Sequence, residues 1–343
     1  EDISDCQSIG NGHVQHTAPF MGGGGGPAGW GGAIAVVPYE MYKIYGDKET
    51  FRRYLPKILR YFDYLDSRSS GGLVCREEEG GWCLGDWCPP EQITICEPFV
   101  NTALYVKQMM MTKEASEAIG ESETAAMLEK RIEEKKQAIL NAYYSPQTGS
   151  FIGDAQGANS FAVDIGLGGE RAFNNTKKKY DAADAFDTGI FGTDILTRVL
   201  FERGCADTAF RLLTSTGKGS FYNMKKQGAT TIWENWDGER SHSHPMFGAV
   251  TRYLFSFILG ITQEKNSAGY EKIVIAPQIP DGLNRASGHI TTVRGEIAVS
   301  FVRTEREMDF YVTVPQKSWF TYGSDCEYEL WEGENHIHID FEE

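Results

Sequence analysis

Two consecutive segments near the start of the chain limit the folds open to it. Residues 33–45 (AIAVVPYEMYKIY) are apolar almost all round, which predicts a helix buried on both sides and kinked at Pro38. Residues 47–66 place apolar side chains at three- and four-residue steps with charges between them, which predicts an amphipathic helix. An inner helix followed by an outer helix forms a helical hairpin.

The same alternation recurs over the following two hundred or so residues. Further helices are expected at residues 98–112, 121–143, 194–203, 206–214 and 247–261. The second of these carries Leu128, Ile132 and Ile139 on one stripe. The third should begin after a capping Thr193 and end at Gly204. Repeated inner and outer helices favour a toroid of hairpins, an (α/α) barrel, with a helical bundle as the alternative.

The hydrophobic period changes after about residue 263. Strand-like segments with alternating apolar positions follow, at residues 270–277, 296–302, 308–314 and 336–341. About 80 residues with this pattern are enough for a small antiparallel β-sandwich. We therefore expect two domains, an (α/α) barrel over residues 1–262 and a β-sandwich over residues 263–343.

Charge and cysteine spacing exclude several classes of function. The net charge of −15 repels nucleic acid and anionic membranes, and no apolar run approaches the ~18 residues of a membrane span. The chain shows no signal peptide and does not begin with Met, which suggests a processed or excised piece of a longer protein. Four of the seven cysteines lie between residues 75 and 96 without a close pair, so zinc is not expected, and both one disulfide and buried free thiols remain open.

Candidate chemistry lies on the loops. In the stretch TTIWENWDG, Glu234 stands between Trp233 and Trp236, a pattern typical of a sugar-cleaving pocket and equally of a buried Trp pair. A five-glycine run at residues 22–26 precedes Trp30, which could stand on a mobile rim. Inverting hydrolysis of a glycoside needs two carboxyl groups, one as acid and one as base, and Glu234 fits either role.

Other polar residues on these loops have simpler interpretations. Asp184 and Asp187 precede a predicted helix, and Asp184 in particular suits capping or charging its N-terminus. His242 and His244 with Asp237 lack a third close ligand, so hydrogen-bonding histidines are favoured over a metal site.

Several motifs in order resemble the bacterial α-L-rhamnosidases of glycoside hydrolase family 78. They are GHVQHTAPF with GGPAGWGGAIAVVPYEMYKIYGD, then GDW, DTGIFGT, GATTIWENWDG, SHSHPMFGAV and GYEKIVIAPQIPDGL. The similarity runs through nearly the whole chain. It implies an (α/α)6 barrel followed by a β-domain, and hydrolysis of terminal α-L-rhamnose with inversion.

The resemblance also implies roles for individual residues. Glu234 matches the general base, His244 a histidine that touches the sugar, and Trp30 and Trp87 match aromatic walls of the rhamnose site. Asp86 and Trp236, from the same motifs, are also expected to bind substrate. The expected partner is a rhamnose-containing glycoside or polysaccharide, and neither a cofactor nor a metal is expected.

The chain departs from the family pattern at its start. The general acid of the family lies in an ERLGW-like stretch upstream of the region matched by residues 11–32, and that stretch has no counterpart here. We expect the first hairpins of the barrel to be absent and the isolated chain to have little activity. A carbohydrate-binding protein without hydrolysis, and another (α/α)-barrel glycosidase of the trehalase or glucoamylase type, are the alternatives.

Overall fold

The computed structural model describes residues 1–19, 28–79, 81, 83–323 and 326–341. The helices are α1 (Asp2–Asp5), α2 (Ala33–Tyr45), α3 (Lys48–Ser67), α4 (Glu97–Ala118), α5 (Ser122–Tyr143), η1 (Ile152–Gly157), α6 (Ala158–Asp164), α7 (Gly169–Asp181), α8 (Ile190–Glu202), α9 (Ala206–Leu213), α10 (Phe221–Lys226), η2 (Pro245–Val250), α11 (Thr251–Tyr253) and η3 (Leu254–Ile258). The five-glycine run lies outside the described residues. None of the described helices is long and apolar enough to cross a membrane.

The strands form two larger sheets and two short hairpins. They are β1 (Ser69–Ser70), β2 (Leu73–Val74), β3 (Tyr144–Ser145), β4 (Ser150–Phe151), β5 (Ile261–Gln263), β6 (Ile273–Ile275), β7 (Arg285–Thr292), β8 (Gly295–Arg303), β9 (Glu307–Val314), β10 (Ser318–Tyr322), β11 (Cys326–Leu330) and β12 (Gly333–Asp340). The larger sheets have the orders β11-β10-β6-β5 and β12-β9-β8-β7.

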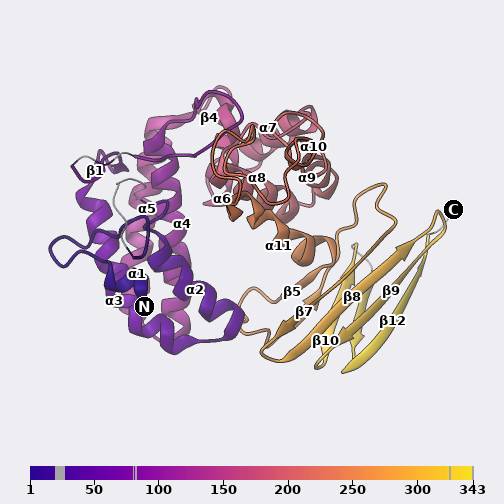
Figure 1. The fold of residues 1–343 in the computed structure, drawn as a ribbon. Coiled ribbons are helices and arrows are strands. Elements are labelled where there is room, and N and C mark those ends of the chain that lie inside the picture. The colour runs from indigo at the N-terminus through magenta and orange to yellow at the C-terminus, as the bar shows by residue number, and fades with distance from the viewer. Residues whose placement is uncertain (20–27, 80, 82, 324–325, 342–343) are drawn as a thin grey trace.

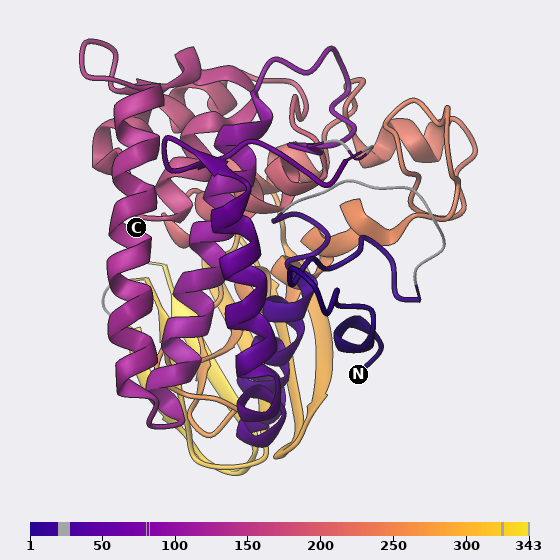
Figure 2. The same ribbon diagram turned by 90° about the vertical axis from the view of Figure 1, so that its left-hand side faces the viewer.

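Two long helical hairpins, α2/α3 and α4/α5, stand side by side, and the shorter helices α6 to α10 form a second group beside them (Figure 1). Turned by 90°, the long helices lie in front of the β-domain (Figure 2). Helix α2 contains Pro38, but Val37, Ile44 and Tyr45 are exposed, so the prediction that this helix is buried on both sides is wrong. The stripe Leu128, Ile132 and Ile139 on α5 is buried, as the sequence predicts. The (α/α) hairpin architecture with its β appendage is thereby confirmed.

The β-domain packs one face of each large sheet into a shared core. Ile297, Val299 and Phe301 on β8 alternate with exposed or half-buried residues, as the period of two requires. Across the register, Phe301 pairs with Phe310 on β9. One pairing, β10 with β6, is parallel, which corrects the expectation of a purely antiparallel sandwich.

The helical expectations need three further corrections. Helix α8 begins at Ile190, so Thr193 lies inside it and shares a hydrogen bond with the hydroxyl of Thr188 instead of capping the helix. The predicted helix at 247–261 consists of 3₁₀, α and π turns in succession. Helices α6, α7 and α10 were not predicted.

All seven cysteines are free thiols, which answers the disulfide question for the described chain.

Candidate active site

Glu234 lies on the loop between α10 and η2, and both of its carboxylate oxygens accept hydrogen bonds. The indole N–H of Trp87 donates to Oε1 at 3.3 Å, and the backbone N–H of Ser241 donates to Oε2 at 3.3 Å. The backbone N–H of Glu234 in turn donates to the carbonyl of Ser241 at 2.8 Å. Two segments separated by 147 residues therefore hold one half-buried carboxylate.

Trp87 is the residue that the structure brings directly to Glu234. Its ring is half-buried, and the guanidinium of Arg240 lies over it at 4.9 Å from the ring centroid. This cation–π contact orients the indole whose N–H faces the carboxylate. Sequence reasoning missed Arg240 and Ser241, because neither residue type next to an acid predicts such contacts.

Asp86 fixes the position of the Trp87 loop. Its side chain is 1% exposed and accepts backbone hydrogen bonds from Gly189 (2.7 Å), Phe191 (3.0 Å) and Gly192 (3.0 Å). These donors are the unpaired N–H groups at the start of α8, where a negative charge is also favoured by the helix dipole. Burial raises the pKa of this carboxyl to about 7, because the three hydrogen bonds only partly offset the loss of water.

The cap of α8 therefore comes from a distant segment and not from the residues that precede the helix. Asp187 instead accepts a hydrogen bond from the hydroxyl of Tyr180 (2.7 Å) and pairs with Lys179 (2.7 Å). No side chain adjoining the start of α8 caps it, so the expected role of Asp184 at this helix falls to Asp86.

Trp30 contacts the first turn of α8. Its half-buried ring packs against Phe191 with ring centroids 5.1 Å apart. Phe191 is also one of the residues whose N–H binds Asp86. Trp30, the first turn of α8 and the Trp87 loop thus form one continuous set of contacts.

The other two tryptophans around Glu234 are in the core. Trp236 is 2% exposed, donates its indole N–H to the carbonyl of Thr188 (3.3 Å) and packs on Phe186 and Phe247. Trp233 is buried and stacks on His242 at 4.5 Å between centroids. The burial of Trp236 gives no support to its predicted contact with substrate.

His244 lies on the same closed loop as Glu234. Its backbone N–H donates to the carbonyl of Ile232 at 2.8 Å, next to the pairing of Glu234 with Ser241. These bonds bring the Glu234 and His244 segments alongside each other. His242 has a different environment, with Nε2 2.8 Å from the carbonyl oxygen of Gly238.

Two groups of side chains in the described part of the chain could hold a metal ion. They are His13 with Glu77 and Glu78, and Glu307 with His338 and Asp340. In the first, an ion pair with Arg68 already neutralises Glu78, and the hydroxyl of Tyr64 donates to Glu77. Neither group includes a residue of the Glu234 site.

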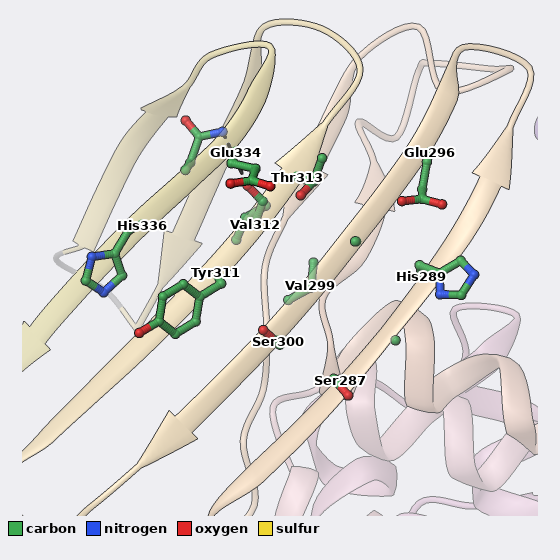
Figure 3. A pocket seen from close by; sticks show the side chains of 13 residues that line it. Ser287, His289, Glu296, Val299, Ser300, Tyr311, Val312, Thr313, Glu334 and His336 are labelled. Carbon is green, nitrogen blue, oxygen red and sulfur yellow. Dashed lines mark hydrogen bonds between the residues drawn. The ribbon is translucent and has the colours of Figure 1, made fainter.

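A hollow of about 750 Å³ also lies away from Glu234, on the outer face of the sheet β12-β9-β8-β7 (Figure 3). Tyr311 and His336 stand at one side of it with their rings stacked, and His289 stands on β7 (Figure 3). Its lining is polar and apolar in equal parts. We place the candidate active site at Glu234 because the carboxylate and its donors meet there.

The arrangement around Glu234 suits a general base. Both hydrogen bonds to the carboxylate are long, and each oxygen has a further lone pair with which to accept a proton. The half-buried indole of Trp87 leaves apolar ring surface beside the carboxylate.

Comparison with known proteins gives the family. The model for the bacterial α-L-rhamnosidase six-hairpin glycosidase domain matches residues 1–258, and that for the bacterial α-L-rhamnosidase C-terminal domain matches residues 260–321. The α-L-rhamnosidases of Alteromonas sp. (strain LOR) and Streptomyces avermitilis are 26% and 28% identical over 84% and 87% of this chain. The chain spans only 33% and 29% of their lengths.

Solved structures agree on the fold. The α-L-rhamnosidase of Streptomyces avermitilis, complexed with L-rhamnose, superposes with a TM-score of 0.85 at 22% identity, over 98% of this chain and 35% of that one. The α-L-rhamnosidase from Dictyoglumus thermophilum gives 0.87 at 18% identity, over 99% and 43%. The first family model covers well over half of the residues, so the chain belongs to the bacterial α-L-rhamnosidase six-hairpin glycosidase family.

Proposed function

We propose that the protein containing this chain hydrolyses terminal α-L-rhamnosides with inversion and that Glu234 is its general base. The observation that carries the proposal is the carboxylate of Glu234 held between the indole of Trp87 and the backbone of Ser241. Membership of the family and the α-L-rhamnosidase names of the relatives support the substrate class. The partner is a rhamnose-containing glycoside or polysaccharide.

In the proposed reaction, one Oε atom of Glu234 takes a proton from a water molecule as its oxygen attacks the anomeric carbon. The bond from that carbon to the glycosidic oxygen breaks, and the leaving oxygen receives a proton from a carboxylic acid. Attack on the face opposite the leaving group inverts the anomeric configuration. This proposal assigns the general base to Glu234 and assigns the general acid to none of the described residues.

The remaining predicted residues take separate roles in the proposal. Trp87 and Trp30 provide apolar walls for the sugar ring and its methyl group, and His244 hydrogen-bonds the sugar. Asp86 acts indirectly, because its oxygens are occupied by the N-terminus of α8 and hold the Trp87 loop in place. The expected division between residues 262 and 263 would cut β5, so we propose that the domains divide just before this strand, near residue 260.

The test is Glu234→Gln in the full-length protein, assayed for release of the aryl group from an aryl α-L-rhamnoside. Loss of the base should lower kcat by about 10²–10⁴-fold, because Gln keeps the shape and cannot take the proton. Glu239→Gln is the matched control, since Glu239 is an exposed acid of the same loop and should leave turnover unchanged.

Three outcomes would contradict the assignment. Undiminished turnover in Glu234→Gln would remove the base role. Calorimetric binding of L-rhamnose by a full-length protein that shows no turnover would favour the carbohydrate-binding alternative. Hydrolysis of aryl glucosides in preference to rhamnosides would favour the trehalase or glucoamylase type.

A further inference from the structure

The outer face of the paired strands β9 and β12 gathers ionisable side chains that the proposed function does not use. The register places Asp340 opposite Glu307, His338 opposite Asp309, and His336 opposite Tyr311. Residues at every second position of a strand share a face, so the side chains of the HIHID segment meet those of β9. Figure 3 shows His336 and Tyr311 next to each other on these two strands.

Three of these side chains converge on one point. The ligand atoms of Glu307, His338 and Asp340 all lie within 4.8 Å of one another. Nε2 of His338 is 3.2 Å from Oδ1 of Asp340. Two donors about 2.1 Å from a tetrahedral zinc ion are about 3.4 Å apart, so this pair already has the spacing of two ligands.

The opposite nitrogen of His338 has the partner that a metal-binding histidine uses. Nδ1 lies 2.9 Å from Oδ1 of Asp309. A carboxylate at this position keeps the proton on Nδ1, so that an ion binds His338 by displacing the proton that Nε2 shares with Asp340. The same oxygen of Asp309 also faces Nε2 of His336 at 2.7 Å, which fixes the carboxylate itself.

The cationic partners of the cluster are histidines, and not Lys or Arg. Within the ranges that the structure describes, the ion pairs of Asp309 and Asp340 involve only histidines, and Glu307 has none with Lys or Arg. This differs from the His13 group, where Arg68 pairs with Glu78. Asp309 pairs with both histidines without Glu307, so this pairing does not account for the approach of Glu307 to His338 and Asp340.

We propose that Glu307, His338 and Asp340 form a binding site for a divalent transition-metal ion of the zinc type, with Asp309 as the positioning residue for His338. One imidazole and two carboxylates favour such ions over Ca²⁺ and Mg²⁺, which prefer oxygen ligands alone. Strand β12 is the edge of its sheet, so a bound ion fastens this edge strand to β9.

Calorimetric titration of the untagged chain with Zn²⁺ tests the site. One saturable site is expected, which disappears in His338→Ala and in the isosteric Asp340→Asn. Asp309→Asn should weaken binding by roughly 10–100-fold, as the loss of an outer-shell partner usually does. His289→Ala, which removes an exposed histidine from the same face of β7, should leave the affinity unchanged.

Two further readouts separate this site from other zinc-binding groups. Because the chain has seven free thiols, Co²⁺ serves as a second probe, and its absorption should show nitrogen and oxygen ligands without thiolate. Saturating Zn²⁺ should raise the melting temperature of the wild type and of His289→Ala, and not that of Asp340→Asn. Far-UV circular dichroism verifies that each variant is folded.

The proposal fails under any of three results. They are absence of Zn²⁺ binding in the wild type, unchanged binding in His338→Ala, and loss of binding in His336→Ala with Asp340→Asn unaffected. The last result would place the ion between the two histidines and would exclude the proposed ligand set.

Discussion

The Glu234 site and the outer face of β9 and β12 hold their polar side chains by different means. Around Glu234, loops far apart in the sequence meet, and each functional group depends on a partner elsewhere, as Trp87 depends on Asp86 and α8. On the sheet, His338 and Asp309 face each other because the strand register puts them there. Changes near Glu234 should therefore affect stability and activity together, whereas changes on the sheet face should leave the fold intact.

The largest loss of stability is expected for a change in the core beneath the sheet β12-β9-β8-β7. Phe310→Ala empties a fully buried position between Phe301 and Phe320, and it should lower the free energy of unfolding by about 3–5 kcal/mol. Urea unfolding measures this loss. A loss of less than 1 kcal/mol would mean that the register does not depend on this core.

The next largest effect is the pH dependence of the free energy of unfolding that results from Asp86. Its folded-state pKa of about 7 is above the usual value of 3.8, so the folded protein binds a proton that the unfolded chain has released between these values. The contribution of this carboxyl is fully present below about pH 4 and is lost as the pH rises through 7. One pKa unit corresponds to about 1.4 kcal/mol, so the shift from 3.8 to about 7 corresponds to a loss of about 4 kcal/mol in the free energy of unfolding.

Urea unfolding of the wild type and of Asp86→Asn across this pH range measures the effect. The difference between their free energies of unfolding should change with pH in the direction given, since Asn does not titrate. Parallel curves would show that the carboxyl is ionised in the folded protein, held so by its three backbone donors.

A smaller effect is expected for the contact between the two loops. Trp87→Phe keeps a ring beneath Arg240 and removes the N–H that faces Glu234, so kcat/KM for an aryl rhamnoside should fall about tenfold in the full-length protein. The free energy of unfolding should change by less than about 1 kcal/mol. Equal activity of the two proteins would show that this hydrogen bond does not serve catalysis.

The smallest effect belongs to the sheet face. Ser287 lies on the exposed side of β7. The free energy of unfolding of the Ser287→Ala variant should therefore differ from that of the wild type by less than about 0.5 kcal/mol. A loss above 1 kcal/mol would contradict the view that this face is independent of the core behind it.

The sequence predicted those features that depend on local periodicity. The buried stripe of α5 and the alternation of Val299 and Phe301 on β8 follow from the spacing of apolar residues, which the surrounding fold does not alter. The start of α8 did not follow, because its cap is Asp86, which is 103 residues away from Gly189 in the chain.

Prediction of the site had the same limit. The motifs pointed to Glu234 and Trp87, and the structure brings these two together. No local pattern distinguishes Trp87, which is half-buried beside the carboxylate, from Trp236, which is in the core, because both are indoles next to an acid. Their difference is set by packing against distant helices.

The hydrogen bond between Trp87 and Glu234 has a consequence for protein synthesis. A ribosome that adds about 5–20 residues per second needs about 7–30 s to make the 147 residues between them. The hairpins α2/α3 and α4/α5 are complete in sequence by Tyr143 and can pack in that interval. The pocket thus assembles only after both long hairpins have been made, and a chain arrested before Glu234 would present the Trp87 indole without its acid.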